Sequence, residues 1–363
     1  MDKRKHGFRG STPLLIVEIC VLLISIGVMY VVVTMTSEVN HKSIDEGKIH
    51  MNDEVVGKKI TGVKRTKTKE EEQVKAKGYR NIALFGVDAR DGELGRGTRS
   101  DTIMIASINQ DTQEIRLISV FRDTYLNLSN DSYNKCNTAY AQGGPEQAIN
   151  MLNMNLDLDI TDYVTIGFSG LIDAVDALGG VEIEVTDSEI SHLNNYQLCM
   201  AEELGVDYIP VEQSGRQLLN GMQATAYCRI RYTKGDDFRR AERQRDVLRA
   251  MMDKASGASV STLTDMVNAV LPQVETSLNV NEILSVLGSV AGYNMVESDG
   301  FPFEGGRAGA NVGSKGSCVI PNDLEENVRQ LHHMLYPEES YTPSARVRQI
   351  DEEIKAQTSE YMQ

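Results

Sequence analysis

The sequence predicts an α/β fold: a layered domain around a central mixed β-sheet, preceded by a single N-terminal transmembrane helix. Short apolar runs typical of buried strands alternate with stretches whose apolar residues follow helical spacing, which is the pattern of layered α/β domains. The second and third runs are joined by the hairpin-like connection NQDTQ at residues 109–113, which favours antiparallel as well as parallel strands. The chain shows no internal repeat of solenoid or propeller period.

A basic segment followed by a long apolar run opens the chain. Four of the first ten residues are Lys or Arg, and the apolar run extends from Leu14 to Met35, about the 20 residues that a helix needs to cross a bilayer. We therefore expect a cytoplasmic tail over residues 1–12, a membrane anchor over 13–36 and, by the positive-inside rule, an extracellular location for everything that follows. A cleaved signal peptide is the alternative interpretation, although its apolar region would be shorter.

A charged segment separates the expected anchor from the first strand. Residues 37–78 are poor in aromatic residues and lack sustained apolar periodicity, so we expect a stalk or linker that sets the height of the domain above the membrane. The domain itself is expected over residues 79–337. Residues 338–363 are polar, and we expect them to form a frayed or disordered tail.

Apolar runs and punctuating residues predict the elements of the domain in turn. Pro145 suits the first turn of a helix, and the glycines at 179 and 180 suit the end of one. Strands are predicted over residues 81–87, 101–108, 114–121, 163–168 and 181–185. Helices are predicted over 143–156 and 169–180, twice within 262–292, and over 324–335.

Charge and cysteine content restrict the partners that the chain can have. The formal net charge of −15 and the pI of about 4.9 argue against nucleic acid, because binding to a phosphate backbone needs a basic face. The five cysteines form no C-x-x-C pair and have no histidine spacing that completes a zinc site, so any metal should be held by oxygen ligands.

Residues 227–245 are the basic exception in this acidic protein. They hold the arginines Arg229, Arg231, Arg239, Arg240, Arg243 and Arg245 around Asp236 and Asp237. The alternation over residues 226–232 predicts a strand with Arg229 and Arg231 on one face. A helix capped by Asp236 or Asp237 would follow, with Arg240, Arg243 and Gln244 on one side.

Such a concentration of guanidinium groups calls for an anionic partner. Arginine suits phosphate because its planar donors match two phosphate oxygens and do not titrate away. The alternative is a solvated charged helix whose arginines pair with aspartates of the same helix.

Three further segments carry residues suited to the same chemistry. Asp88 ends one strand and Asp101 begins the next, with Arg99 just before it, so two carboxylates could share Mg²⁺ or simply form turns. Arg122 and Asp123 directly follow a buried strand, where they form either a site or a local ion pair. Residues 143–145 lead into a helix N-terminus that could assist an anion or merely cap the helix.

Together these segments resemble the LytR-CpsA-Psr family of Gram-positive envelope enzymes. The motifs NIALFGVDAR, RSDTIMIASIN, SVFRDTYL, NTAYAQGGPEQAI, DYVTIGFSGLIDAVDALGGVEIEV, LNGMQATAYCRIRY and DDFRRAERQR occur in the family's order over residues 79–253. The resemblance implies an αβα domain that binds a polyprenyl pyrophosphate lipid. It also implies transfer of a glycopolymer, such as teichoic acid or capsular polysaccharide, from that lipid to a peptidoglycan hydroxyl, forming a phosphodiester.

The resemblance also implies roles for individual residues. The family's motifs place Mg²⁺ (or Mn²⁺) on Asp88 and Asp101, and the pyrophosphate on Arg99, Arg122, Arg229, Arg231, Arg240, Gln244 and, nearby, Arg243. Arg99, Arg122 and Asp123 are the expected catalytic residues, with Asp123 either orienting Arg122 or accepting the hydroxyl proton. Two positions depart from the family pattern: Arg239 stands where glycine is common, and Phe121 where proline is usual.

Two other functions use the same arginines. A membrane-anchored module could bind a polyprenyl phosphate without turnover, or the enzyme could hydrolyse the lipid pyrophosphate with water. Retention of both Asp88 and Asp101 favours catalysis, because a binding module has less need of a metal. Among the cysteines beyond the anchor, Cys136 and Cys228 are expected to be buried thiols, and a Cys199–Cys318 disulfide is a hypothesis that the extracellular location permits.

Overall fold

The computed structural model describes residues 40–55, 78–88, 94–231 and 236–362. The expected tail and membrane anchor, 1–12 and 13–36, lie outside these residues, as does most of the expected stalk. Among the helices of the described part, none has both the length and the apolar character needed to cross a bilayer.

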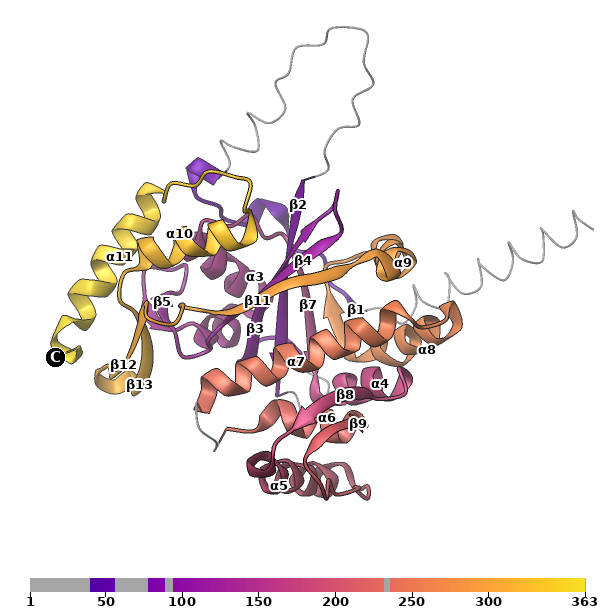
Figure 1. Ribbon diagram of the computed structural model, residues 1–363. Coiled ribbons are helices and arrows are strands. Elements are labelled where there is room, and N and C mark those ends of the chain that lie inside the picture. Colours follow the sequence, from indigo (N-terminus) through magenta and orange to yellow (C-terminus); the bar gives the residue numbers. More distant parts are fainter. Residues whose placement is uncertain (1–39, 56–77, 89–93, 232–235, 363) are drawn as a thin grey trace, which may run out of the picture.

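A seven-stranded mixed sheet forms the centre of the fold, in the order β1-β10-β7-β2-β3-β4-β11 (Figure 1). Its strands are β1 (Asn40–His41), β2 (Tyr79–Val87), β3 (Ser100–Asn109), β4 (Glu114–Val120), β7 (Asp162–Gly167), β10 (Val274–Thr276) and β11 (Asn294–Phe301). The meander β2-β3-β4 is antiparallel, whereas β7 runs parallel to β2 and β11 parallel to β4. The predicted mixed sheet and its early hairpin are therefore confirmed.

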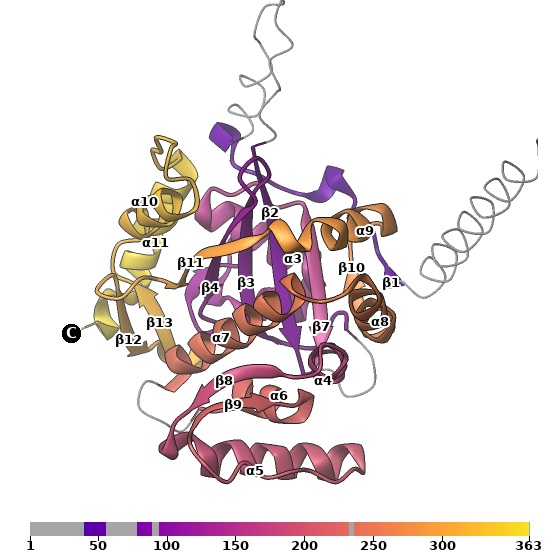
Figure 2. The ribbon, with the colours of Figure 1, turned by 45° about the vertical axis from the view of Figure 1, so that its right-hand side comes forward.

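Helices cover both faces of the sheet, as Figures 1 and 2 show. On one face lie α3 (Asn137–Leu156), α10 (Leu324–Leu335) and α11 (Ala345–Thr358), packed on Phe85 and Ile103. On the other lie α4 (Phe168–Ala177), α7 (Asp236–Ser256) and α8 (Val260–Val270), with α7 over Met104 and Leu117. Helix α6 (Gly221–Arg229) packs against α4 and α7, beyond the sheet. This division follows from strand geometry, because successive side chains such as Ile103 and Met104 point to opposite faces.

An arm extends beyond the carboxyl ends of β2 and β7. It consists of α5 (Asp187–Leu204) and the two-stranded sheet of β8 (Val181–Val185) and β9 (Gly215–Leu219), packed with α6 around its own apolar core. The predicted strand 181–185 therefore exists but belongs to this arm. Two small hairpins, β5 (Tyr125–Asn127) with β6 (Tyr133–Lys135) and β12 (Arg307–Asn311) with β13 (Ser317–Pro321), complete the described sheets.

Helix α3 contains a kink at the predicted helix start. Gly144 has φ 68° and ψ −157°, and Pro145 begins the straight part that follows. A left-handed φ is costly for residues with a side chain, so glycine suits this position. Residues 148–156 are almost entirely buried, which agrees with their interpretation as ordinary core.

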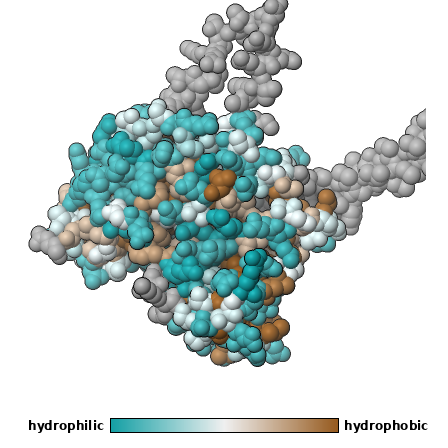
Figure 3. Space-filling model, in the orientation of Figure 1, coloured by the Kyte–Doolittle hydropathy of each residue, from teal (hydrophilic) through white to brown (hydrophobic). Residues whose placement is uncertain are grey.

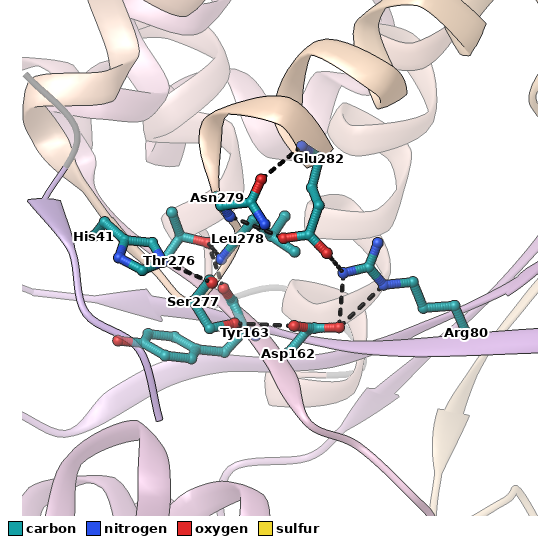
Figure 4. Close-up of polar contacts among 9 residues, drawn as sticks. All are labelled: His41, Arg80, Asp162, Tyr163, Thr276, Ser277, Leu278, Asn279 and Glu282. Atoms are coloured by element: carbon teal, nitrogen blue, oxygen red, sulfur yellow. Dashed lines mark hydrogen bonds and ion pairs between the residues drawn. The ribbon is translucent and has the colours of Figure 1, made fainter. Parts of the chain in front are cut away.

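A polar network ties α9 (Val280–Ser289) to the amino ends of β2 and β7 (Figure 4). Arg80 donates to Asp162 at 3.0 and 2.8 Å and to Glu282 at 2.7 Å. Burial lowers the pKa of Arg80, but the two carboxylates outweigh burial and raise it above its ordinary value. Asn279 accepts from the backbone of Glu282 at 3.1 Å and so caps the helix.

Two sequence predictions are wrong. Residues 226–229 form the end of α6 and not a strand, because Asn220 and Gln223 form a capping box and residues 223–228 are all buried. The expected frayed tail instead contains α11, whose Val347, Ile350 and Ile354 are fully buried. Their spacing of three and four residues places them on one helix face.

Residues 40–55 were expected within the stalk, whereas the structure packs them on the domain. Strand β1 pairs in parallel with β10. Further along, the backbone of His50 donates to Asn150 at 2.8 Å, and Asn52 donates to the carbonyl of Met154 at 3.0 Å. The segment is therefore an integral edge of the fold.

The four cysteines of the described part are free thiols. Cys136, Cys228 and Cys318 are buried, as expected for the first two, and burial raises the pKa of Cys228 to about 12. Cys199 is exposed on α5, in the arm, whereas Cys318 is buried in β13. The hypothesis of a Cys199–Cys318 disulfide is wrong.

Candidate functional site

The expected site residues gather where β2 ends, β3 begins and β4 ends. Strands β2 and β3 are antiparallel, and Val87 pairs with Ser100. Asp88, which follows Val87, and Asp101, which follows Ser100, therefore lie at the same end of these two adjacent strands. Arg122 lies two residues beyond β4, which is paired with β3. The ends of β2 and β4, together with the start of β3, thus carry both carboxylates and the first arginine.

Three arginines and two aspartates form a guanidinium cluster at this end: Arg122, Arg231, Arg240, Asp101 and Asp237. Asp101 contacts Arg122 at 2.5 Å and Arg231 at 3.5 Å. Asp237 lies 3.2 Å from Arg240, 3.5 Å from Arg122 and 3.9 Å from Arg231. Two parts of the basic stretch over residues 227–245, Arg231 and the first turn of α7, therefore contact the residues at the strand ends, as the sequence predicts.

The two carboxylates of the guanidinium cluster do not neutralise its three arginines. Arg240 is only 4% exposed. Its Nε is buried without a hydrogen-bond partner in the described part of the chain. Its Nη1 and the Nε of Arg122 are also buried, and they make only ion-pair contacts without hydrogen-bond geometry, to Asp237 at 3.2 Å and to Asp123 at 3.5 Å. Unpaired buried donors are costly, so these atoms point to an anion as the missing acceptor.

The pKa values of the cluster reflect the same imbalance. Burial, together with the positive charges of Arg122 and Arg231, lowers the pKa of Arg240 to about 10. Burial also lowers the pKa of Arg122, but Asp101 and Asp237 outweigh it and raise that pKa above its ordinary value. Burial raises the pKa of Asp237, whereas the neighbouring arginines outweigh it, so this carboxyl stays ionised. An arriving anion would relieve the repulsion on Arg240.

Asp123 lies behind Arg122 and is held by two cations. Its Oδ2 lies 3.5 Å from Arg122 Nε, and its Oδ1 lies 3.0 Å from Lys135 Nζ. Lys135, at the end of β6, is a site neighbour that sequence reasoning missed, because nothing in its surroundings distinguishes it from a surface lysine. With a cation at each oxygen, Asp123 is arranged to orient Arg122.

Three other expected residues lie around this cluster and not within its ion pairs. Arg229 places its guanidinium over the rings of Phe168, at 4.5 Å, and Tyr196, at 5.6 Å. Gln244 donates to the carbonyl of Cys228 at 3.4 Å and so joins α7 to the end of α6. Arg99 is exposed at the start of β3.

Arg243 is the expected site residue that the structure places elsewhere. Its side chain is 1% exposed and pairs with Glu189 of α5 at 2.7 Å, and it also donates to the carbonyl of Ile230 at 3.1 Å. Arg239 turns to the same side, pairing with Glu242 at 2.7 Å. This side of α7 therefore fastens the arm to the domain, and the helix turns only Arg240 and Asp237 into the cluster.

An aromatic stack that sequence reasoning missed clamps the cluster from the side. Phe121 precedes Arg122 and Phe238 follows Asp237, and their rings meet edge to face at 4.6 Å. The guanidinium of Arg307, on β12, lies 4.1 Å from the Phe238 ring and 5.0 Å from the Phe121 ring. Gly300 makes room, because a Cβ there would lie 2.2 Å from the Phe121 ring.

We expect Arg307→Ala to lower the activity of this candidate site by about 10- to 100-fold, because small displacements of catalytic groups have effects of this size. Loss of the clamp frees Phe238 and with it the first turn of α7, which carries Asp237 and Arg240. The measurement is kcat together with the thermal midpoint. Lys315→Ala is the matched control, since Lys315 lies 5.1 Å from the Tyr125 ring, away from the cluster. Equal losses in both variants would contradict the positioning role.

An apolar cavity of about 220 Å³ lies at the other edge of the sheet, on the face covered by α8. Its wall is formed by apolar side chains of β7, α8, β10 and α9, among them Val164, Met266, Val270, Val274, Ile283 and Val286. No polar surface lines it within the described residues. The sequence did not reveal it, because its wall comes from four separate segments.

Known proteins share both the sequence and the architecture of this chain. The model of the LytR_cpsA_psr family matches residues 33–319. A polyisoprenyl-teichoic acid–peptidoglycan teichoic acid transferase TagU from Oceanobacillus iheyensis is 31% identical over 226 residues, which are 60% of this chain and 65% of that protein. The match thus spans slightly less than two thirds of this relative.

Two solved structures show the same fold. A Streptococcus agalactiae protein, gbs0355, superimposes with a TM-score of 0.61 at 26% identity, covering 74% of this chain and 91% of that one. The LytR-CPS2A-psr family protein YwtF (TagT) with bound octaprenyl pyrophosphate lipid gives a TM-score of 0.55 at 21% identity, covering 81% and 99%. Together with the family match over most of the domain, these findings show that the chain belongs to the LytR-CpsA-Psr family.

Proposed function

We propose that this protein transfers a glycopolymer from a polyprenyl-pyrophosphate lipid to a hydroxyl of peptidoglycan, forming a phosphodiester. The observation that carries the proposal is the guanidinium cluster, whose buried donors on Arg122 and Arg240 are not satisfied by hydrogen bonds within the described residues. A diphosphate supplies acceptors in number. The relative TagU is named for transfer of teichoic acid to peptidoglycan, and the structure of YwtF (TagT) has octaprenyl pyrophosphate lipid bound.

The residues of the cluster would act by binding and charge neutralisation. Phosphoryl transfer needs little covalent help from protein, and alignment and electrostatic stabilisation supply most of the acceleration. Arg122, Arg231 and Arg240 would hold the diphosphate, with Arg99 and Arg229 at the periphery. Asp123 would fix the direction of Arg122 through its 3.5 Å contact, while Lys135 holds its other oxygen.

The reaction then proceeds by displacement at the glycan-linked phosphorus. An acceptor hydroxyl oxygen forms the new P–O bond, the bond to the lipid phosphate oxygen breaks, and lipid monophosphate leaves while the hydroxyl proton is released. The arginines stabilise the charge on the transferred group and on the departing phosphate. Hydrolysis would follow the same path with water as the acceptor, so the choice of acceptor distinguishes the two reactions.

A divalent cation fits beside this cluster. Asp88 and Asp101 present carboxylate oxygens at adjacent strand ends, and Mg²⁺ typically takes one or two carboxylates together with phosphate oxygens and waters. When bound, the ion would neutralise diphosphate charge. Asp101 already contacts Arg122 and Arg231, so metal and arginines would share its two oxygens.

Removal of divalent metal with EDTA is expected to abolish transfer, and added MgCl₂ to restore it. Asp88→Asn and Asp101→Asn should each weaken Mg²⁺ affinity by about 10-fold or more, as loss of an important metal contact does. Calorimetric titration of Mg²⁺ in the presence of farnesyl pyrophosphate measures this directly. Asp265→Asn, on α8, serves as the control. Unchanged Mg²⁺ affinity in both strand-end variants would refute the assignment.

The apolar cavity suits the hydrocarbon chain of the lipid. Met266→Trp should fill part of its 220 Å³ and weaken binding of farnesyl pyrophosphate by about 10-fold or more, because each excluded methylene costs about 0.8 kcal/mol. Binding of inorganic pyrophosphate should stay the same. Val260→Trp, at the exposed start of the same helix, is the control. If Met266→Trp bound both ligands as the parent does, the lipid chain would lie elsewhere.

We further propose that residues 13–36 anchor the chain in the cell membrane with the catalytic domain outside. The apolar run and the basic N-terminus support this topology. In that position the domain faces both of its substrates, the lipid donor and the peptidoglycan.

The decisive assay combines the purified protein with a lipid-linked glycan donor and peptidoglycan oligosaccharides. Covalent attachment of glycan to the acceptor supports transfer. Free phosphoglycan would indicate hydrolysis, and unchanged donor would indicate binding without turnover.

A further inference from the structure

The segment that follows the expected anchor is fastened to the edge of the sheet that also lines the apolar cavity. Strand β1 pairs with β10 through Asn40 opposite Glu275 and His41 opposite Thr276. Lys42 continues the pairing with a backbone hydrogen bond to Thr276 at 3.0 Å, and its side chain lies 3.7 Å from Glu275. The His41 ring contacts the carbonyl of Ser277 at 3.1 Å, as Figure 4 shows.

This attachment leaves little chain between the membrane and the sheet edge. Residues 37–39 alone separate the expected anchor from β1, and a fully extended chain advances at most about 3.6 Å per residue. The edge formed by β1 and β10 therefore starts within roughly 14 Å of the membrane end of the anchor. Figures 1 and 2 both place α8 and α9 beside this edge.

The surface beside this edge differs in charge from the rest of the protein. Between residues 256 and 294 only Asp265, Glu275 and Glu282 are charged. Glu275 is buried and Glu282 is paired with Arg80. One quarter of the whole chain is charged, and its net charge is −15. Since an acidic surface is repelled by anionic lipids, this charge-poor face is the one that can approach a bilayer most closely.

An exposed apolar surface on the arm is the competing candidate. Leu198, Leu204, Val206, Ile209 and Leu218 are all exposed there, and Figure 3 shows apolar side chains over this lower part of the molecule. However, the same segment carries Glu202, Glu203, Asp207 and Glu212. These carboxylates would oppose an anionic membrane.

We propose that the charge-poor face, residues 256–294, lies against the outer surface of the bilayer, held there by the pairing of β1 with β10. Because Val274 and Thr276 of β10 line the apolar cavity, this orientation turns the cavity toward the lipid. A polyprenyl chain could then pass from the bilayer into the protein without crossing water. This orientation rests on the proposed lipid substrate and the proposed anchor.

The orientation can be tested with the full chain reconstituted in vesicles of phosphatidylglycerol and phosphatidylcholine. Cys20→Ser and Cys199→Ser remove the thiols outside the buried set, and single cysteines for a bimane label are placed at Val260 and Asn268 of α8. Ala356→Cys, exposed on α11, and Ile209→Cys, exposed on the arm, are the controls. Brominated lipids in the vesicles then quench only labels that touch the bilayer.

We expect loss of fluorescence at Val260 and Asn268 and none at Ala356 or Ile209. Equal quenching at all positions, or quenching only at Ile209, would overturn the proposal. Protection of Val260 and Asn268 from a water-soluble quencher without bromolipid quenching would do so too, because it would identify the face as a contact between two copies of the chain.

The role of the strand pairing has its own test. Insertion of about 20 Gly and Ser residues between Ser37 and Glu38 gives a flexible tether, and we expect it to abolish quenching at both α8 positions. Persistent quenching would refute the orienting role of β1. Farnesyl pyrophosphate binding by the same chain in detergent should be unchanged. Failure of that binding in every variant, with the quenching pattern retained, would count against the proposed function and in favour of the orientation.

Discussion

Arg122→Ala should lower kcat for the proposed glycan transfer by about 10³-fold while leaving the fold intact, in the range found for arginines that stabilise transferring phosphoryl groups. Arg122 is the hub of the guanidinium cluster, with Asp101 at 2.5 Å and both Asp123 and Asp237 at 3.5 Å. Its removal deprives the diphosphate of a bidentate donor and leaves Asp101 with less positive charge beside it. Single-turnover kinetics with a lipid-linked donor separates this loss from weaker binding.

Arg116→Ala is the matched control for this variant. Arg116 lies on β4, the strand that leads to Arg122, and its side chain is 12% exposed, against 17% for Arg122, but it pairs with Glu114 at 3.2 Å, away from the site. We expect it to retain activity close to the parent. If Arg122→Ala transferred glycan at the parental rate, the cluster would not be the catalytic site.

Arg243→Ala should lower the free energy of unfolding by about 3 kcal/mol, because it leaves the buried Glu189 with only the more distant Arg239, at 3.8 Å, as a counter-ion. Arg243 is 1% and Glu189 2% exposed, and their contact of 2.7 Å joins α7 to α5. Chemical denaturation measures the change. The double variant Arg243→Met/Glu189→Met should recover much of the loss, since apolar residues of similar size can replace a buried ion pair.

The pair of Arg243 and Glu189 also predicts that the stability of the protein depends on pH. Burial raises the pKa of Glu189, but hydrogen bonds from Thr186 and Arg243 outweigh it and hold the pKa below its ordinary value of 4.5. A depressed folded-state pKa contributes stability that is present above the unfolded pKa and lost as pH falls through the folded one. The stability difference between the parent and Arg243→Ala should therefore shrink below about pH 4.5. A constant difference down to pH 3 would show that the pair does not act through the Glu189 charge.

Strands and helices were predicted correctly where the spacing of apolar residues and the capping residues agreed with the packing in the structure. Strands β2, β3 and β4 read clearly because they are buried on both faces, and α10 was predicted over its full length of Leu324–Leu335. The end of α6 was mistaken for part of a strand over residues 226–232. Almost all of this helix is buried, so it shows no 3.6-residue period, and the short alternation of those residues dominated.

The residues at strand ends and part of the basic stretch were predictable from the sequence. Asp88, Asp101 and Arg122 lie at ends of β2, β3 and β4 that the topology brings together, and Arg231 contacts Asp101 there. Arg243 was placed in the site because it follows Arg240 by three residues, yet its partner Glu189 comes from α5, whose position depends on tertiary packing. Lys135 and Arg307 reach the site from the small hairpins β5-β6 and β12-β13, and no local pattern announces such contacts.

An experimental structure of the protein with farnesyl pyrophosphate and Mg²⁺ would show whether the guanidinium cluster binds the diphosphate. We expect diphosphate oxygens within hydrogen-bonding distance of Arg122, Arg231 and Arg240, with the prenyl chain directed to the cavity between α8 and α9. Diphosphate bound at any other place, with these three arginines still paired only to Asp101 and Asp237, would contradict this expectation.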